Sequence, residues 1–255
     1  MTASPTLAEW LAERPFALAM SSGFFAFFAH TGMLSALLDR GLAPRLVSGS
    51  SAGALVGGAW AAGLAPDALA ARLETLERGD FWDPALGAGL LAGERFDRLL
   101  RALLPVTRMR DCAVPVRISV FDILRRRTVV LDDAELPRAI RASCAVPGLF
   151  HPVWIERRPY WDGGILDRPG LAGVIEADRV LFHHISARSP WRAPGAASLA
   201  IPRRAGMTTL VIDDLPRSGP FRLDAGRLAL ALAREATRRA LETPVTDSVV
   251  RLSAA

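Results

Sequence analysis

Residues 45–62 have the sequence RLVSGSSAGALVGGAWAA. The segment begins with a short run typical of a buried strand and ends with small apolar residues typical of a buried helix. Between them lies a Gly-x-Ser-x-Gly motif formed by Gly49, Ser51 and Gly53. On such a sharp strand-to-helix turn a serine hydroxyl is exposed, and the two glycines remove Cβ atoms that would collide. The motif predicts a nucleophile elbow centred on Ser51; the alternative is a turn that binds phosphate or nothing.

The rest of the chain alternates between strand-like and helix-like segments. Strands are predicted at 16–20, 114–121, 128–131, 178–185 and 207–212, and helices at 25–40, 66–77, 94–104, 134–144 and 223–241. A short hairpin is predicted within 153–161, and 207–212 is expected to be the last strand. Strands separated by helices indicate an α/β fold whose mainly parallel sheet has helices on both faces. Nothing marks a second domain, so residues 1–255 are predicted to form one.

The composition excludes several kinds of chemistry. All 31 basic residues are arginine, so the chain has neither a P-loop lysine nor a Schiff-base lysine. The net charge of +5 suggests an anionic partner. Because the arginines are scattered, we expect no nucleic acid and, at most, transient contact with an anionic membrane surface. Two cysteines and four histidines without ligand spacing predict no metal and no disulfide framework.

The N-terminal sequence predicts no export signal. Residues 1–14 contain two glutamates and no basic region before an apolar run. The longest apolar stretch, 16–29, is too short to span a bilayer. We therefore expect a cytoplasmic protein, either free or peripheral on the membrane.

A serine nucleophile needs a base. The four histidines do not lie in a clear loop after a late strand, although His183 or His184 would serve in a Ser-His-Asp arrangement. Asp162 is followed by Gly163 and Gly164, a tight turn that allows close backbone approach. A carboxylate can itself act as a base when its surroundings tune its pKa. By turn chemistry alone, this triplet is more often a plain hairpin turn.

Several linked motifs resemble the patatin-like phospholipases. They are RASCAVPGLF at 141–150, HPV at 151–153, YWDGG at 160–164, VPVRISVFD at 114–122, and the first loop and helix at 20–38. The resemblance covers about residues 16–169, so residues 15–170 carry the recognisable motifs and 171–255 are expected to complete the sheet and add a C-terminal helix. It implies a three-layer α/β/α fold and a Ser–Asp dyad, with Ser51 as nucleophile, Asp162 as base, and no metal or other cofactor.

The loop that would form the oxyanion hole differs from the resembling family. The family pattern is Gly-Gly-Gly-x-Arg-Gly, whereas residues 22–27 are SGFFAF. Backbone N–H groups can still stabilise an oxyanion, so Gly23 and Phe24 are the predicted donors. The resemblance implies a serine hydrolase acting on phospholipid or other acyl esters. The alternative is a patatin-like protein that binds lipid or acyl chains with low or no turnover, because the loop is altered.

Two aromatic segments are candidates for a lipid site. The phenylalanines at 24, 25, 27 and 28 cannot all face one side of a helix. We expect some of them in the core and others along an acyl pocket. Segment 81–91, with Trp82, is predicted to be either a lipid-facing rim or an exposed loop.

Overall fold

The computed structural model describes residues 4–187, 189, 193 and 195–254. Its α-helices are α1 (Leu7–Glu13), α2 (Phe27–Asp39), α3 (Ala52–Ala61), α4 (Pro66–Glu74), α5 (Glu94–Leu103), α6 (Leu136–Ser143) and α7 (Leu223–Leu241). Its strands are β1 (Ala17–Met20), β2 (Leu46–Ser50), β3 (Gly89–Leu91), β4 (Val116–Asp122), β5 (Arg127–Leu131), β6 (Gly148–Phe150), β7 (Val153–Ile155), β8 (Arg158–Asp162), β9 (Val180–His184), β10 (Met207–Asp213) and β11 (Val249–Ser253).

One large sheet organises the described residues. Nine strands join in the order β11-β10-β9-β1-β2-β4-β8-β7, with β5 also paired to β4. The pairs from β11 to β4 are parallel, whereas β5, β8 and β7 are joined by antiparallel pairs. The predicted α/β fold with a mostly parallel sheet is thus confirmed, and so is the hairpin, formed by β7 and β8. Strands β3 and β6 form a separate parallel pair.

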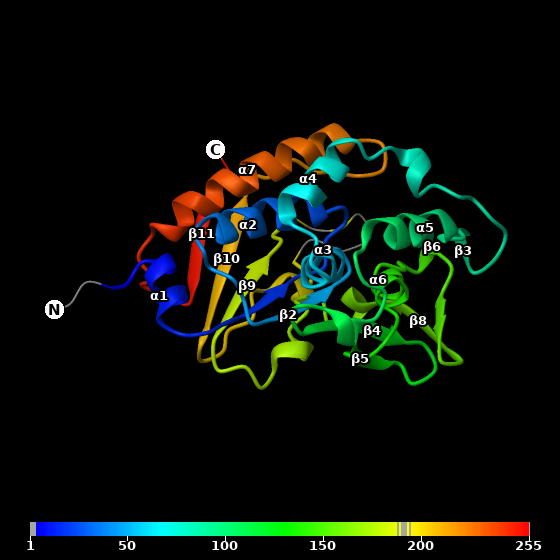
Figure 1. The fold of residues 1–255 in the computed structure, drawn as a ribbon, viewed down its shortest axis with the longest axis horizontal. Helices are drawn as coiled ribbons and strands as arrows, with labels where there is room; N and C mark the ends of the chain where they lie inside the picture. Colours follow the sequence, from blue (N-terminus) through cyan, green and yellow to red (C-terminus); the bar gives the residue numbers. More distant parts are fainter. Residues whose placement is uncertain (1–3, 188, 190–192, 194, 255) are drawn as a thin grey trace.

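The two faces of the sheet are covered differently. Helices α2, α3, α6 and α7 enclose the main core against one face, where Leu18 and Leu210 are fully buried. In Figure 1, α2 and α7 lie side by side along the top of the view. A smaller core on the other face contains Ala19, Val174 and Phe182. Its cover includes the 3-10 turn Ala172–Val174, which contacts β2 and β4.

Four elements were absent from the sequence prediction: α1, β3, β6 and β11. The expectation that 207–212 is the last strand is wrong, because β11 pairs with β10 from Val249 to Ser253. Only Val250 of this edge strand is buried, so its sequence carries little strand signal. Helix α1 is only seven residues long and begins at a capping box between Thr6 and Glu9. Helix α1 contacts Thr243 and strand β11 pairs with β10, so partners far away in the chain stabilise these two elements.

Candidate active site

Ser51 occupies a strained turn between β2 and α3. Its backbone has φ 54° and ψ −116°, a conformation that non-glycine residues rarely adopt. A Cβ on Gly49 would stand 2.4 Å from the carbonyl carbon of Gly53, and a Cβ on Gly53 would stand 2.2 Å from the carbonyl oxygen of Met20. The strand and the helix that the sequence predicts around this motif are both present. The glycines are needed because neighbouring backbone passes directly against them.

The edge of β4 explains how Asp162 comes close to Ser51. Ser50 of β2 is paired with Ser119 of β4, and Asp162 of β8 is paired with the next residue, Val120. Strand β5 pairs with both stretches of β4, so β2 and β8 must share the other edge. Asp162 therefore lies just beyond the end of β2, where the chain turns at Ser51.

The side chains of Ser51 and Asp162 form a direct hydrogen bond. Ser51 Oγ donates to Asp162 Oδ2 at 2.7 Å, and the backbone N–H of Gly164 donates to Asp162 Oδ1 at 2.7 Å. Asp162 is buried, with 5% of its surface exposed. A Cβ on Gly163 would lie 2.1 Å from the carbonyl oxygen of Ser119. The two glycines after Asp162 thus allow the close backbone approach that orients its carboxylate.

Ser143 supports the turn at Ser51. The backbone N–H of Ser51 donates to Ser143 Oγ at 2.8 Å, and Ser143 Oγ donates to the carbonyl oxygen of Ser119 at 2.7 Å. Ser143 is fully buried at the end of α6. Sequence reasoning quoted it within 141–150 but gave it no role. These two bonds link the strained turn to β4 and hold the amide of Ser51 in place.

The loop after β1 contributes backbone donors beside Ser51. Gly23 and Phe24 both line the same cavity as Ser51. No acceptor among the described residues takes the N–H of Gly23. The left-handed backbone conformation of this loop falls on Phe25, with φ 57°, and not on Phe24. Phe24 therefore needs no conformation that requires glycine.

Sequence reasoning missed one further donor. Ala52 is the first residue of α3 and lines the cavity, and its N–H has no acceptor among the described residues. The first N–H groups of a helix lack partners within the helix and carry its positive dipole end. Ala52 directly follows the serine of the motif, and this position could have identified its N–H as a donor from the sequence.

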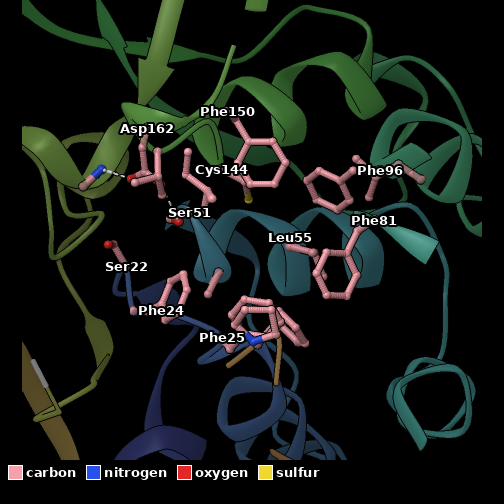
Figure 2. A pocket seen from close by; sticks show the side chains of 18 of the residues that line it. Ser22, Phe24, Phe25, Ser51, Leu55, Phe81, Phe96, Cys144, Phe150 and Asp162 are labelled. Atoms are coloured by element: carbon pink, nitrogen blue, oxygen red, sulfur yellow. Dashed lines mark hydrogen bonds between the residues drawn. The ribbon is translucent and has the colours of Figure 1, made fainter. Parts of the chain in front are cut away.

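An apolar cavity of about 460 Å³ extends from Ser51 and Asp162. Its apolar wall includes Phe25, Phe27, Leu55, Phe81, Phe96 and Phe150. In Figure 2 the rings of Phe81, Phe96 and Phe150 lie on one side of the Ser51–Asp162 pair. Phe28, by contrast, is fully buried against Gly226 of α7. The four phenylalanines at 24, 25, 27 and 28 are thus divided between core and cavity, and Trp82 lies on the cavity wall.

The buried histidines His30, His183 and His184 lie away from Ser51. His30 Nδ1 and His183 Nδ1 are 2.8 Å apart, and His30 Nε2 lies 2.8 Å from the carbonyl oxygen of Ser21. His184 packs against Phe182 on the opposite face of the sheet. None of the three lines the cavity. The structure therefore does not bring His183 or His184 to the position that a Ser-His-Asp arrangement requires.

We expect these histidines to make stability depend on pH. Burial is the main cause that lowers the pKa of both His30 and His184 to about 4; the charge of Arg168 contributes to this lowering, and a hydrogen bond to Ser21 opposes it at His30. Between pH 6.5 and 4 the unfolded chain binds these protons and the folded chain does not, so stability falls on acidification. Each histidine should lower the free energy of unfolding by on the order of 3 kcal/mol as the pH falls across that window. Urea unfolding at several pH values measures this loss of stability. The His184→Asn variant should have a free energy of unfolding that depends less on pH. An unchanged pH dependence would contradict the role assigned to His184.

Cys144 is the second potential nucleophile at the cavity. Burial raises the pKa of its thiol well above the ordinary value, and the nearby Asp162 carboxylate raises it further, against a hydrogen bond with Ser51 that lowers it. A thiol held in its protonated form is a weak nucleophile. Cys144 therefore lines the cavity without acting as its nucleophile.

Two features that would suggest another kind of function are absent from the described residues. No three side chains of His, Cys, Asp or Glu gather there as metal ligands would. No helix in that part of the chain is both long enough and apolar enough to cross a bilayer. The expectation that the chemistry needs no metal stays a prediction.

Comparison with known proteins identifies the family. The model of the patatin-like phospholipase family matches residues 18–175, more than half of the chain. The chain belongs to the patatin-like phospholipase family, which confirms the resemblance found in its motifs. The uncharacterized NTE family proteins Rv1063c of Mycobacterium tuberculosis and Mb1092c of Mycobacterium bovis are each 35% identical to it over 99 residues. That match spans 38% of this chain but only 28% of each relative.

A solved structure shows the same fold. VipD from Legionella pneumophila superposes with a TM-score of 0.66 at 14% sequence identity, over 89% of this chain and 66% of that chain. At such low identity the likeness concerns the fold alone. It confirms the patatin-like arrangement of the sheet.

Proposed function

We propose that this protein is a serine acyl-ester hydrolase of the lipase or phospholipase type, with Ser51 as nucleophile and Asp162 as base. The observation that carries the proposal is the 2.7 Å hydrogen bond from Ser51 Oγ to Asp162 Oδ2 at the end of an apolar cavity. Membership of a phospholipase family supports lipid substrates. An ester whose acyl chain fills the cavity would present its carbonyl carbon to Ser51.

The first half of the reaction acylates the serine. Asp162 takes the proton of Ser51 Oγ as that oxygen attacks the ester carbonyl carbon. The negative oxygen that forms faces the N–H groups of Gly23, Phe24 and Ala52, which stabilise it without rearranging. When the intermediate collapses, the bond to the alcohol oxygen breaks, and the proton on Asp162 passes to that oxygen.

The second half releases the acyl group. Ser51 Oγ no longer carries a proton, so Asp162 Oδ2 can accept one from water. The water oxygen attacks the acyl carbon, the bond to Ser51 Oγ breaks, and the proton returns from Asp162 to Ser51. The products are a carboxylic acid and the original enzyme.

The second candidate is an acyl- or lipid-binding protein with low turnover. The observation that favours it is the loop at 22–27, where Phe25 takes a left-handed conformation that costs free energy for any residue with a side chain. Ala26 replaces the arginine of the family pattern there and begins α2 as its N-terminal cap residue.

One experiment separates the two candidates. Purified protein is treated with a fluorophosphonate probe and assayed against a panel of phospholipids and p-nitrophenyl esters of increasing chain length. A hydrolase binds the probe covalently at Ser51 and turns over at least one ester. Lipid that co-purifies with protein inert toward the probe and the panel would favour the binding protein.

The cavity should control acyl chain length. Leu55 lies one helical turn after Ser51 and lines the cavity, so Leu55→Trp would fill space close to the nucleophile. We expect kcat/KM for dodecanoyl esters to fall about tenfold or more while that for acetyl esters changes little, because only the long chain loses its burial. Equal losses for both chain lengths would argue against this cavity as the acyl site.

The rim of the cavity supports the predicted transient contact with membranes. Leu86 and Leu90 are exposed and belong to the same segment as Phe81 and Trp82, which line the cavity. Exposed leucines beside a lipid entrance would insert into the interface of a bilayer. This contact stays a prediction.

A further inference from the structure

Ser22 is a third polar side chain at the Ser51–Asp162 pair. Its residue is 8% exposed and lines the cavity. A Cβ placed on Gly164 would stand 2.3 Å from Ser22 Oγ and 2.9 Å from Asp162 Oδ1. The Ser22 hydroxyl therefore packs against the same glycine whose N–H holds Asp162, and Figure 2 shows Ser22 beside the Ser51–Asp162 pair.

The hydroxyl of Ser22 is available for a ligand. The neighbouring Ser21 hydroxyl accepts the N–H of Ile185 at 2.9 Å, and the Ser22 N–H donates to the carbonyl oxygen of Arg168 at 2.7 Å. The Ser22 hydroxyl itself has no hydrogen-bond partner among the residues that the structure describes. Its backbone is thus held in place while its side chain keeps a donor and two acceptor sites free.

Ser22 lies on the side of the dyad away from the acyl chain. Figure 2 places Leu55, Phe81 and Phe96 on one side of Ser51 and Ser22 on the other. An acyl chain in the apolar part directs its ester alcohol toward Ser22. After the alcohol departs, water enters the same space, because attack on the acyl group reverses the geometry of departure.

We propose that the Ser22 hydroxyl binds the oxygen atom that exchanges a proton with Asp162. This atom is first the ester alcohol oxygen as it leaves, and then the oxygen of the water that hydrolyses the acyl-enzyme. This proposal rests on the proposed function. Water bound by Ser22 and by Asp162 Oδ2 has its oxygen aimed at the acyl carbon. Asp162 takes the proton, the new C–O bond forms, and the bond to Ser51 Oγ breaks. Ser22 takes no proton in this step and is the orienting partner of the water.

The lifetime of the acyl-enzyme tests the proposal. Wild type, Ser22→Ala and Ser22→Thr are mixed with p-nitrophenyl butyrate, substrate is removed by rapid desalting, and the butyryl group on Ser51 is followed by intact-protein mass spectrometry. Loss of one hydrogen bond to the attacking water corresponds to about a tenfold slower step. We expect the adduct of Ser22→Ala to decay about tenfold more slowly, and that of Ser22→Thr, which keeps the hydroxyl, within about threefold of wild type.

The outcomes separate this proposal from the proposed function. Adduct formation in wild type with equal decay in all three proteins overturns the role of Ser22 and leaves the Ser51 mechanism standing. Slower decay in both variants, with lowered thermal stability, would show a packing role and also overturn it. No adduct and no p-nitrophenol release in wild type would instead overturn the proposed function.

Discussion

Ser51→Ala is expected to abolish ester hydrolysis, with kcat falling roughly 10⁴-fold or more, because alanine has no hydroxyl that could attack the ester carbonyl carbon. Asp162→Asn keeps the shape of the side chain but removes the base. We expect kcat to fall about 10³- to 10⁴-fold, because the serine would then have to lose its proton without assistance. Initial rates of p-nitrophenyl butyrate hydrolysis and fluorophosphonate labelling measure both effects.

Ser50→Ala is the matched control for the loss of a hydroxyl. Ser50 precedes the nucleophile and is fully buried, and its Oγ has no hydrogen-bond partner among the described residues. The variant should retain activity within about threefold, since a buried hydroxyl without a partner contributes little to the fold.

Activity that survives Ser51→Ala in a folded protein would refute the nucleophile assignment. Full activity of Asp162→Asn would refute the base.

Gly53→Ala is expected to destabilise the fold by about 3 kcal/mol, or roughly 6–12 °C in Tm. Helix propensity alone predicts the opposite sign, because alanine is favoured over glycine inside a helix by about 1 kcal/mol. The new Cβ would stand 2.2 Å from the carbonyl oxygen of Met20, and that backbone belongs to central strand β1. Since neither element can move without disturbing the sheet, the clash should outweigh the propensity.

Gly57→Ala, one turn further along α3, is the control for that prediction. A Cβ there would meet only the end of the Met20 side chain, at 3.0 Å, and this flexible group can shift. Its stability should stay within about 1 kcal/mol of wild type. Thermal and urea unfolding of the two variants give the comparison, and equal stabilities would contradict the backbone contact at Gly53.

Local sequence patterns predicted the regular elements that carry their own signal. The predicted helix at 223–241 has the same bounds as α7, because apolar residues recur along it at helical spacing. The edge strand β11 was missed because its five residues have little apolar alternation and are held by pairing with β10. A strand of that kind is defined by its neighbour and not by its own side chains.

The candidate site divides in the same way. Ser51, Asp162 and their glycines could be named from motifs because close backbone approach leaves few residue choices. Ser143 and the Ser22 hydroxyl could not, because a serine inside a motif says nothing about which atom it faces. The Ala52 N–H could have been named, because it directly follows the serine of the motif. The left-handed conformation at Phe25 was likewise invisible, since phenylalanine rarely adopts it.

The sequence by itself therefore determined the strand–turn–helix at 45–62, the alternation of strands and helices, and the family. These follow from short-range constraints: side-chain periodicity and the steric demand for glycine at a sharp turn. Only the tertiary structure decided that Asp162 meets Ser51, because that contact depends on β2 and β8 sharing one edge of β4 across 111 residues of chain. It also decided which phenylalanines line the cavity, and that His183 contacts His30 and leaves Asp162 as the partner of the serine.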